Sequence, residues 1–139
     1  MTVPFFLDTN VLEYAATSRI SDEHKSTVAK RIVAEIEFGI SAQVLQEFYV
    51  TVTRKAVAGP SPDELALWID KLLQVPIVPI DAALVAEPIA ISRRFLITYW
   101  DAAIVAAAAR LGASVLLTED LNHGQVYGAV RVENPFRGG

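Results

Sequence analysis

Short apolar runs alternate with helical patterns along the whole chain, and this alternation constrains the fold most strongly. Strands are predicted at residues 4–7, 39–41, 76–80, 114–118 and 129–133, the first and fourth buried and the last half-exposed, with amphipathic helices along the chain. Strands separated by helices favour a parallel sheet that is covered on both faces. We therefore predict an α/β fold of three layers, α/β/α, with a central, mainly parallel sheet of about five strands. We see no linker or repeat, so residues 1–139 are expected to form a single domain.

Several local signals predict where the helices begin and end. Ser61, Pro62 and Glu64 have the spacing of a capping box with proline in the first helical turn. Asp81 is placed to cap the following helix, and Gly112 is placed to stop the alanine-rich helix at residues 100–111. Pro88 lies inside a helical pattern, which predicts a kink or a restart there.

Composition restricts the classes of function. Cysteine is absent, which excludes disulfides, thiolate metal sites and cysteine nucleophiles and fits a reducing compartment such as the cytoplasm. No secretory signal is visible, and the most apolar stretch is interrupted by Asp101 and Arg110, so no membrane span is expected. The net charge is -4, so a bound polyanion would need a local basic patch or metal ions.

Acidic residues follow two of the clearest predicted strands. Asp8 ends the run "FFL" and is followed by Thr9 and Asn10, while Glu119 and Asp120 end the run "SVLLT". Ligands of parallel sheets gather outside the carboxyl ends of the strands, so these side chains could form one site. Helix capping by Asp8 and a simple turn at Asp120 explain the same residues structurally. Taken one at a time, these positions leave both interpretations open.

Two further acids lie on helices. The neighbours of Glu47 at helical spacing include Val44 and Val50, a partly apolar face on which a free carboxylate is costly. Asp101 shares its helix face with Val105, although the helix dipole also favours an acid in a first turn. An exposed Glu on an amphipathic helix is common, so the set of four acids is more informative than any one of them.

Four segments, in this order and at these spacings, resemble one known family. The segments "FFLDTNVLEY", "SAQVLQEFY", "YWDAAIVAAA" and "LLTEDLNHG" are similar to those of the PIN-domain ribonucleases, particularly the VapC-type toxins of prokaryotic toxin–antitoxin pairs. The resemblance covers nearly the whole chain. This sequence departs from the family pattern at Pro88, within the helix before "YWDAA", and at Leu96, where a glycine is common.

The resemblance implies a metal-dependent ribonuclease with Asp8, Glu47, Asp101 and Asp120 as catalytic and metal-binding residues. Thr9, Asn10 and Thr118 would support them. Oxygen ligands without His or Cys favour a hard cation, Mg²⁺ or Mn²⁺. We expect Asp8 and Asp101 to be direct ligands, Glu47 to bind metal or orient the attacking water, and Asp120 to serve a second or water-mediated position. The number of ions stays open.

Candidate substrate contacts come from paired basic residues and from aromatic residues. Arg93 and Arg94 precede the Asp101 segment and are the preferred candidates for contact with RNA phosphates, ahead of the pairs at 54–55 and 30–31. Tyr99 and Trp100 could stack on bases, but we expect them to pack between helix and sheet. His123 follows a strand beside a glycine and is interpreted as a loop residue rather than a general base.

The resemblance also implies partners. An antitoxin protein is expected to cover the acidic pocket, offering it an Arg or Lys, and a homodimer is a family expectation. Two alternatives remain open, namely a PIN-like module that only binds RNA or a protein, and a different Mg²⁺-dependent α/β phosphohydrolase. A haloacid-dehalogenase-type phosphatase is disfavoured because Asn10 stands where it needs a second Asp. A receiver-type domain is disfavoured because no lysine follows the run "SVLLT".

Overall fold

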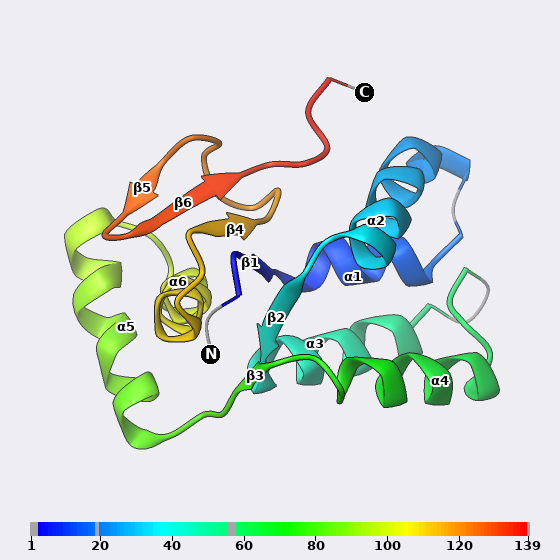
Figure 1. Cartoon of the computed structure of the whole chain (residues 1–139), viewed down its shortest axis with the longest axis horizontal. Coiled ribbons are helices and arrows are strands. Elements are labelled where there is room, and N and C mark those ends of the chain that lie inside the picture. Colours follow the sequence, from blue (N-terminus) through cyan, green and yellow to red (C-terminus); the bar gives the residue numbers. More distant parts are fainter. Residues whose placement is uncertain (1–2, 19, 56–57, 139) are drawn as a thin grey trace.

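The computed structural model describes residues 3–18, 20–55 and 58–138 (Figure 1). The strands are β1 (Phe5–Leu7), β2 (Phe38–Ser41), β3 (Ile77–Val78), β4 (Val115–Leu117), β5 (Val126–Tyr127) and β6 (Val130–Glu133). The helices are α1 (Thr9–Ala16), α2 (Glu23–Glu35), α3 (Ala42–Thr53), α4 (Pro62–Leu72), α5 (Ala82–Phe95) and α6 (Tyr99–Leu111), and a 3-10 turn, η1 (Ile20–Asp22), precedes α2.

Within the described residues the strands form one six-stranded sheet in the order β3-β2-β1-β4-β6-β5. All neighbouring pairs are parallel except β5 and β6, which form an antiparallel pair. The predicted parallel sheet is confirmed, with one strand more than expected, because β5 was not predicted. Strands β1 and β4 are neighbours, with Leu7 opposite Leu117. The residues that follow these two strands therefore emerge side by side at one edge of the sheet.

The helices cover both faces of the sheet. Figure 1 shows α5 and α6 on one side and α1 to α4 on the other. Helix α6 is buried from Ala102 to Ala108 and lies against five of the strands, because its small side chains allow a close approach. None of the helices within the described ranges is long and apolar enough to cross a membrane.

Most local predictions for the helix ends are confirmed. Ser61 and Glu64 form the capping box of α4, Asp81 caps α5 by accepting a hydrogen bond from the backbone N–H of Leu84, and Gly112 ends α6 in the left-handed conformation. The predicted restart at Pro88 is wrong, because α5 continues through it as one helix packed along α6. The sequence pattern predicts a helix from Ala42 to about residue 57; α3 ends at Thr53, and residues 56–57 lie outside the described residues.

The position at which the family pattern has a glycine keeps a glycine-like backbone. Leu96 ends α5 with φ 55° in the left-handed region, and its side chain is 90% exposed. A side chain is strained in this region, because Cβ approaches the following carbonyl group. The turn before α6 therefore has a backbone conformation that favours glycine, with leucine in its place.

Candidate functional site

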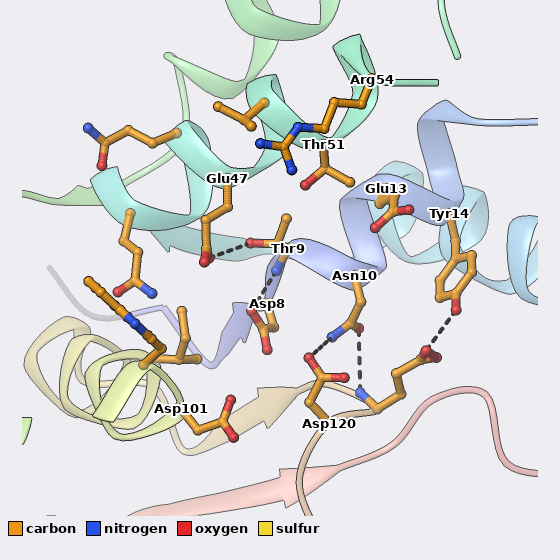
Figure 2. Close-up of a pocket in the computed structure, with 16 residues that line it drawn as sticks. Asp8, Thr9, Asn10, Glu13, Tyr14, Glu47, Thr51, Arg54, Asp101 and Asp120 are labelled. Atoms are coloured by element: carbon orange, nitrogen blue, oxygen red, sulfur yellow. Dashed lines mark hydrogen bonds between the residues drawn. The ribbon is translucent and has the colours of Figure 1, made fainter. Parts of the chain in front are cut away.

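A cavity of about 580 Å³ opens where the carboxyl ends of β1 and β4 meet helices α3 and α6. The structure brings all four predicted acids to it, along with two of the three predicted supporting residues: Asp8, Glu47, Asp101, Asp120, Thr9 and Asn10. Figure 2 shows these side chains reaching the cavity from different elements. Residues more than a hundred positions apart in the sequence therefore form one acidic site.

Asp8 both caps α1 and lines the cavity, so the two interpretations of this residue are compatible. One carboxylate oxygen accepts a hydrogen bond from the backbone N–H of Thr9 at 2.7 Å, and the other accepts from the hydroxyl of Thr118 at 2.8 Å. Only 6% of Asp8 is exposed. Burial raises the pKa of Asp8 to about 7, opposed by these two hydrogen bonds and reinforced by the charges of Asp120 and Glu47. Near neutral pH the carboxyl group of Asp8 is therefore only partly ionised, and a nearby cation would favour its ionised form.

Thr118 lies fully buried behind the cavity wall and connects three of its residues. Its hydroxyl donates to Asp8 and accepts from the side-chain amide of Asn10 and from the backbone N–H of Asp120, each at 3.1 Å. The same amide of Asn10 also donates to the carboxylate of Asp120 at 3.1 Å. The polar residues after β1 therefore orient the acids after β4.

The other two acids come from helices. Glu47 lies in the middle of α3 and accepts a hydrogen bond from the hydroxyl of Thr9 at 3.1 Å. Asp101 lies in the first turn of α6, and its backbone N–H donates to the capping hydroxyl of Thr98 at 3.1 Å. The pKa of Asp120 is raised, chiefly by burial and also by the charge of Asp101, against the lowering effect of its bond from Asn10. These charges act on one another across the cavity.

Two more acids line the cavity, and both have lysine partners. Glu13 forms an ion pair with Lys55 at 2.7 Å, and Glu119 forms one with Lys25 at 3.1 Å. The hydroxyl of Tyr14 on α1 also donates to Glu119 at 2.7 Å, so this carboxylate is bound to residues of α1 and α2. Within the described residues no ion pair neutralises the four predicted acids. Those four acids are therefore the carboxyl groups of the cavity that no lysine or arginine neutralises in the described part of the chain.

The donor set is suited to a hard divalent cation. The four acids offer only oxygen atoms, which are the ligands that Mg²⁺ and Mn²⁺ prefer. Over the described ranges of the chain, no three acidic or histidine side chains stand close enough together, as placed, to hold one ion. Binding a cation through three of them requires that their side chains turn toward a common point.

The sequence profile of the PIN domain family matches residues 5–129. The chain belongs to the PIN domain family. No protein in the curated collection that was compared matches it. The family and the α/β fold agree with the prediction made from the four sequence segments.

Several solved structures share the fold of this PIN domain. A toxin–antitoxin complex from Klebsiella pneumoniae aligns with a TM-score of 0.66 and 18% identity over 94% of this chain and 96% of that one. VapC20 of Mycobacterium tuberculosis, a toxin that cleaves the sarcin–ricin loop, aligns with a TM-score of 0.64 and 19% identity over 81% of this chain and 86% of that one. A Rickettsia felis VapBC2 complex bound to promoter DNA aligns with a TM-score of 0.62 and 17% identity over 94% of this chain and 97% of that one. At these identities the likeness concerns the fold.

The candidate basic residues differ in where they lie relative to the acidic cavity. Arg93 and Arg94 lie in the last turn of α5 and do not line the acidic cavity, and Arg94 instead borders a separate apolar cavity beside Phe95. Arg54, at the end of α3, lines the acidic cavity of this PIN domain, seven residues after Glu47. Helical spacing placed Arg54 on the face of Glu47, a signal that the sequence offered and that we did not use.

Other outcomes concern aromatic and polar residues. The expected packing role is wrong for Trp100, which is 65% exposed and lines the cavity, and Tyr99 packs edge-on against it. His123 accepts a hydrogen bond from the backbone N–H of Asn134 at 3.1 Å and is a loop residue. Gln43, one helical turn before Glu47, lines the cavity and was not predicted.

Proposed function

We propose that this PIN domain hydrolyses RNA phosphodiester bonds with the help of Mg²⁺ or Mn²⁺. The observation that supports it most is the cavity with four acids that lack lysine partners among the described residues, beside two acids that have them. Clustered carboxylates without counter-ions repel one another by up to about 4 kcal/mol for a close pair at an effective dielectric constant of 20. A site of this kind is stable when cations or protons neutralise it.

Each residue has a proposed role. Asp8 and Asp101 would hold the cation directly, from the end of β1 and the start of α6. Glu47, bonded to Thr9, would orient the attacking water, and Asp120, bonded to Asn10, would serve a second or water-mediated position. A bound Mg²⁺ or Mn²⁺ lowers the pKa of water and neutralises phosphate charge.

Substrate binding would depend on Arg54, a cation among the cavity-lining residues. Its guanidinium group can bind phosphate through two hydrogen bonds, which offsets the repulsion between RNA and the acids. Trp100, exposed at the cavity, would stack on a base. Attack of water on phosphorus would leave a 5′-phosphate on one product and a 3′-hydroxyl on the other.

The experiment is RNA cleavage by the purified protein. EDTA should abolish cleavage, Mn²⁺ or Mg²⁺ should restore it, and the products should carry 5′-phosphates. Asp101→Asn should be inactive with either ion, whereas Asp70→Asn, an exposed acid on α4, should match the parent protein. Cleavage that survives exhaustive chelation, or that Asp101→Asn retains, contradicts the proposal. No cleavage of any RNA by the metal-loaded parent would favour a binding module instead.

We also propose that the protein is the toxin of a toxin–antitoxin pair. Two structures with the same fold are toxin–antitoxin complexes, which supports this role. A small antitoxin offering an Arg or Lys would fit the unpaired acids, and co-purification with the product of the adjacent gene tests this. A homodimer is proposed on the family expectation, and light scattering of the purified protein checks it.

A further inference from the structure

Gln43 carries an unusual atom. Its amide nitrogen is the one buried side-chain nitrogen or oxygen without a hydrogen-bond partner among the residues that the structure describes. Burying an unpaired N–H group is unfavourable, because the group loses its hydrogen bonds to water. Such a group in a folded protein calls for an explanation, and a functional role is one of the common ones.

The position of Gln43 connects it to the acidic cavity. It is the second residue of α3, and its side chain lines the cavity. Glu47 follows one helical turn later, and residues four apart lie on the same face of a helix, about 5–6 Å apart at Cβ. The unpaired amide and the acid that we assign to the attacking water therefore share one wall.

RNA bound in the cavity would need hydrogen-bond donors, and Arg54 at the end of α3 is one of them. Six of its side chains are carboxylates, which accept hydrogen bonds and cannot donate them when ionised. The RNA backbone offers phosphoryl oxygens and 2′-hydroxyl groups, which also accept. A glutamine amide supplies two N–H donors without a charge, so it leaves the acids free for a cation, unlike the lysines beside Glu13 and Glu119. Its terminal torsion has a broad minimum, so the amide can turn toward a ligand.

We propose that the amide of Gln43 donates a hydrogen bond to an oxygen of the RNA backbone beside the cut bond. This contact holds the strand against the α3 wall, at the level of Glu47, and it gives a partner to an amide nitrogen that has none among the described residues. The inference rests on the proposed ribonuclease function and identifies a residue that positions its substrate.

The test uses Gln43→Met, which keeps the length of the side chain and removes its hydrogen bonds. The melting temperature of the metal-free variant should be unchanged or up to roughly 4 °C higher, because an unpaired buried group is gone. Single-turnover cleavage of RNA below saturation should fall about 3- to 10-fold, the loss of one hydrogen bond. Gln74→Met, an exposed amide at the end of α4, is the matched control and should change neither quantity.

The melting temperature and the cleavage rate together distinguish a role in positioning RNA from a role in folding. A melting temperature that falls together with activity means that Gln43 has a structural role, and an unchanged cleavage rate removes its role in positioning; either result overturns the inference. A parent protein that cleaves no RNA refutes the proposed function itself. A parent protein that cleaves, with a variant that cleaves equally, refutes only the role of Gln43.

Modified substrates identify the acceptor. RNA with a single 2′-deoxy nucleotide at the cut site tests the hydroxyl group, and RNA with a phosphorothioate at the cut bond tests the phosphoryl oxygen. The effect of Gln43→Met should shrink toward 1-fold with the substrate that lacks the natural acceptor, as in a double-mutant cycle. An effect that stays undiminished with both substrates contradicts a backbone acceptor and overturns the inference.

Discussion

Replacing Asp8 with asparagine should make the metal-free protein more stable at pH 8 and less dependent on pH. Burial is the main reason why the pKa of Asp8 rises from 3.8 to about 7 in the folded chain. This difference of about three units corresponds to about 4 kcal/mol, at roughly 1.4 kcal/mol per unit. The folded state therefore holds the proton of Asp8 more tightly than the unfolded state does.

The direction of the effect follows from this difference. Below pH 4 the Asp8 carboxyl is protonated in both states, and its pKa shift costs no stability. Between pH 4 and pH 7 the unfolded chain loses the proton first, so the stability of the folded protein decreases as the pH rises. Above pH 7 the whole of this stability, about 4 kcal/mol, is lost. Asparagine does not ionise and is as good a helix cap as aspartate, so Asp8→Asn removes the decrease.

Urea unfolding in EDTA at pH 5, 7 and 8 measures the effect. At pH 5 the parent protein has already lost about 1.6 kcal/mol, at roughly 1.4 kcal/mol per pH unit above 3.8, while the altered carboxylate hydrogen bond costs the variant about 1 kcal/mol, so the two should agree within about 1 kcal/mol. At pH 8 it should be more stable, and Mn²⁺ should stabilise the parent protein but not the variant. Asp70→Asn serves as the control and should keep the parental pH dependence. Equal pH slopes for Asp8→Asn and the parent, or a less stable variant at pH 8, refute the reasoning.

Two further substitutions test other parts of the structure. Arg54→Gln should lower the rate of RNA cleavage below saturation several-fold and reduce the salt slope of RNA binding by about 1, as for the loss of one phosphate contact. Arg93→Gln should change neither quantity. A larger effect of Arg93→Gln than of Arg54→Gln would support the residue preferred from the sequence instead. Leu96→Gly should raise the melting temperature by roughly 1–4 °C, because it relieves a left-handed residue whose side chain is exposed. A lower melting temperature of Leu96→Gly in thermal unfolding would mean that the leucine side chain contributes contacts.

The fold was predictable where local signals were strong and repeated. Apolar runs such as residues 115–117 and caps such as Ser61 depend on neighbouring residues only, and the structure contains them where the sequence indicated. Strand β5 was missed because two residues, one of them exposed, carry no readable alternation. Pro88 was over-interpreted, since the packing of α5 along α6 maintains the helix where proline removes one hydrogen bond.

The site was predictable in part. Asp8 and Asp120 follow predicted strands, which placed both at the carboxyl edge of the sheet, but the pairing of β1 with β4 that makes them neighbours was not predicted. Arg54 and Gln43 depend on which face of α3 meets the cavity, and this is decided by the packing of α3 on α1 and β2. Arg93 does not line the cavity for the same reason, because nearness to Asp101 in the sequence does not decide which way the end of α5 faces.

Thr118 has a consequence for how the cavity could adapt to different occupants. A hydroxyl group has one proton and two lone pairs, and the donor to Asp8 and the two acceptor contacts engage all of them. Rotation of this side chain would break several contacts at once, so the half of the cavity built on the strand ends is preorganised. Glu47, on the helical half, has a single bond from Thr9 near the surface. An ion of different radius would accordingly be accommodated by movement of the helical side chains such as Glu47, while the side chains at the strand ends keep their geometry.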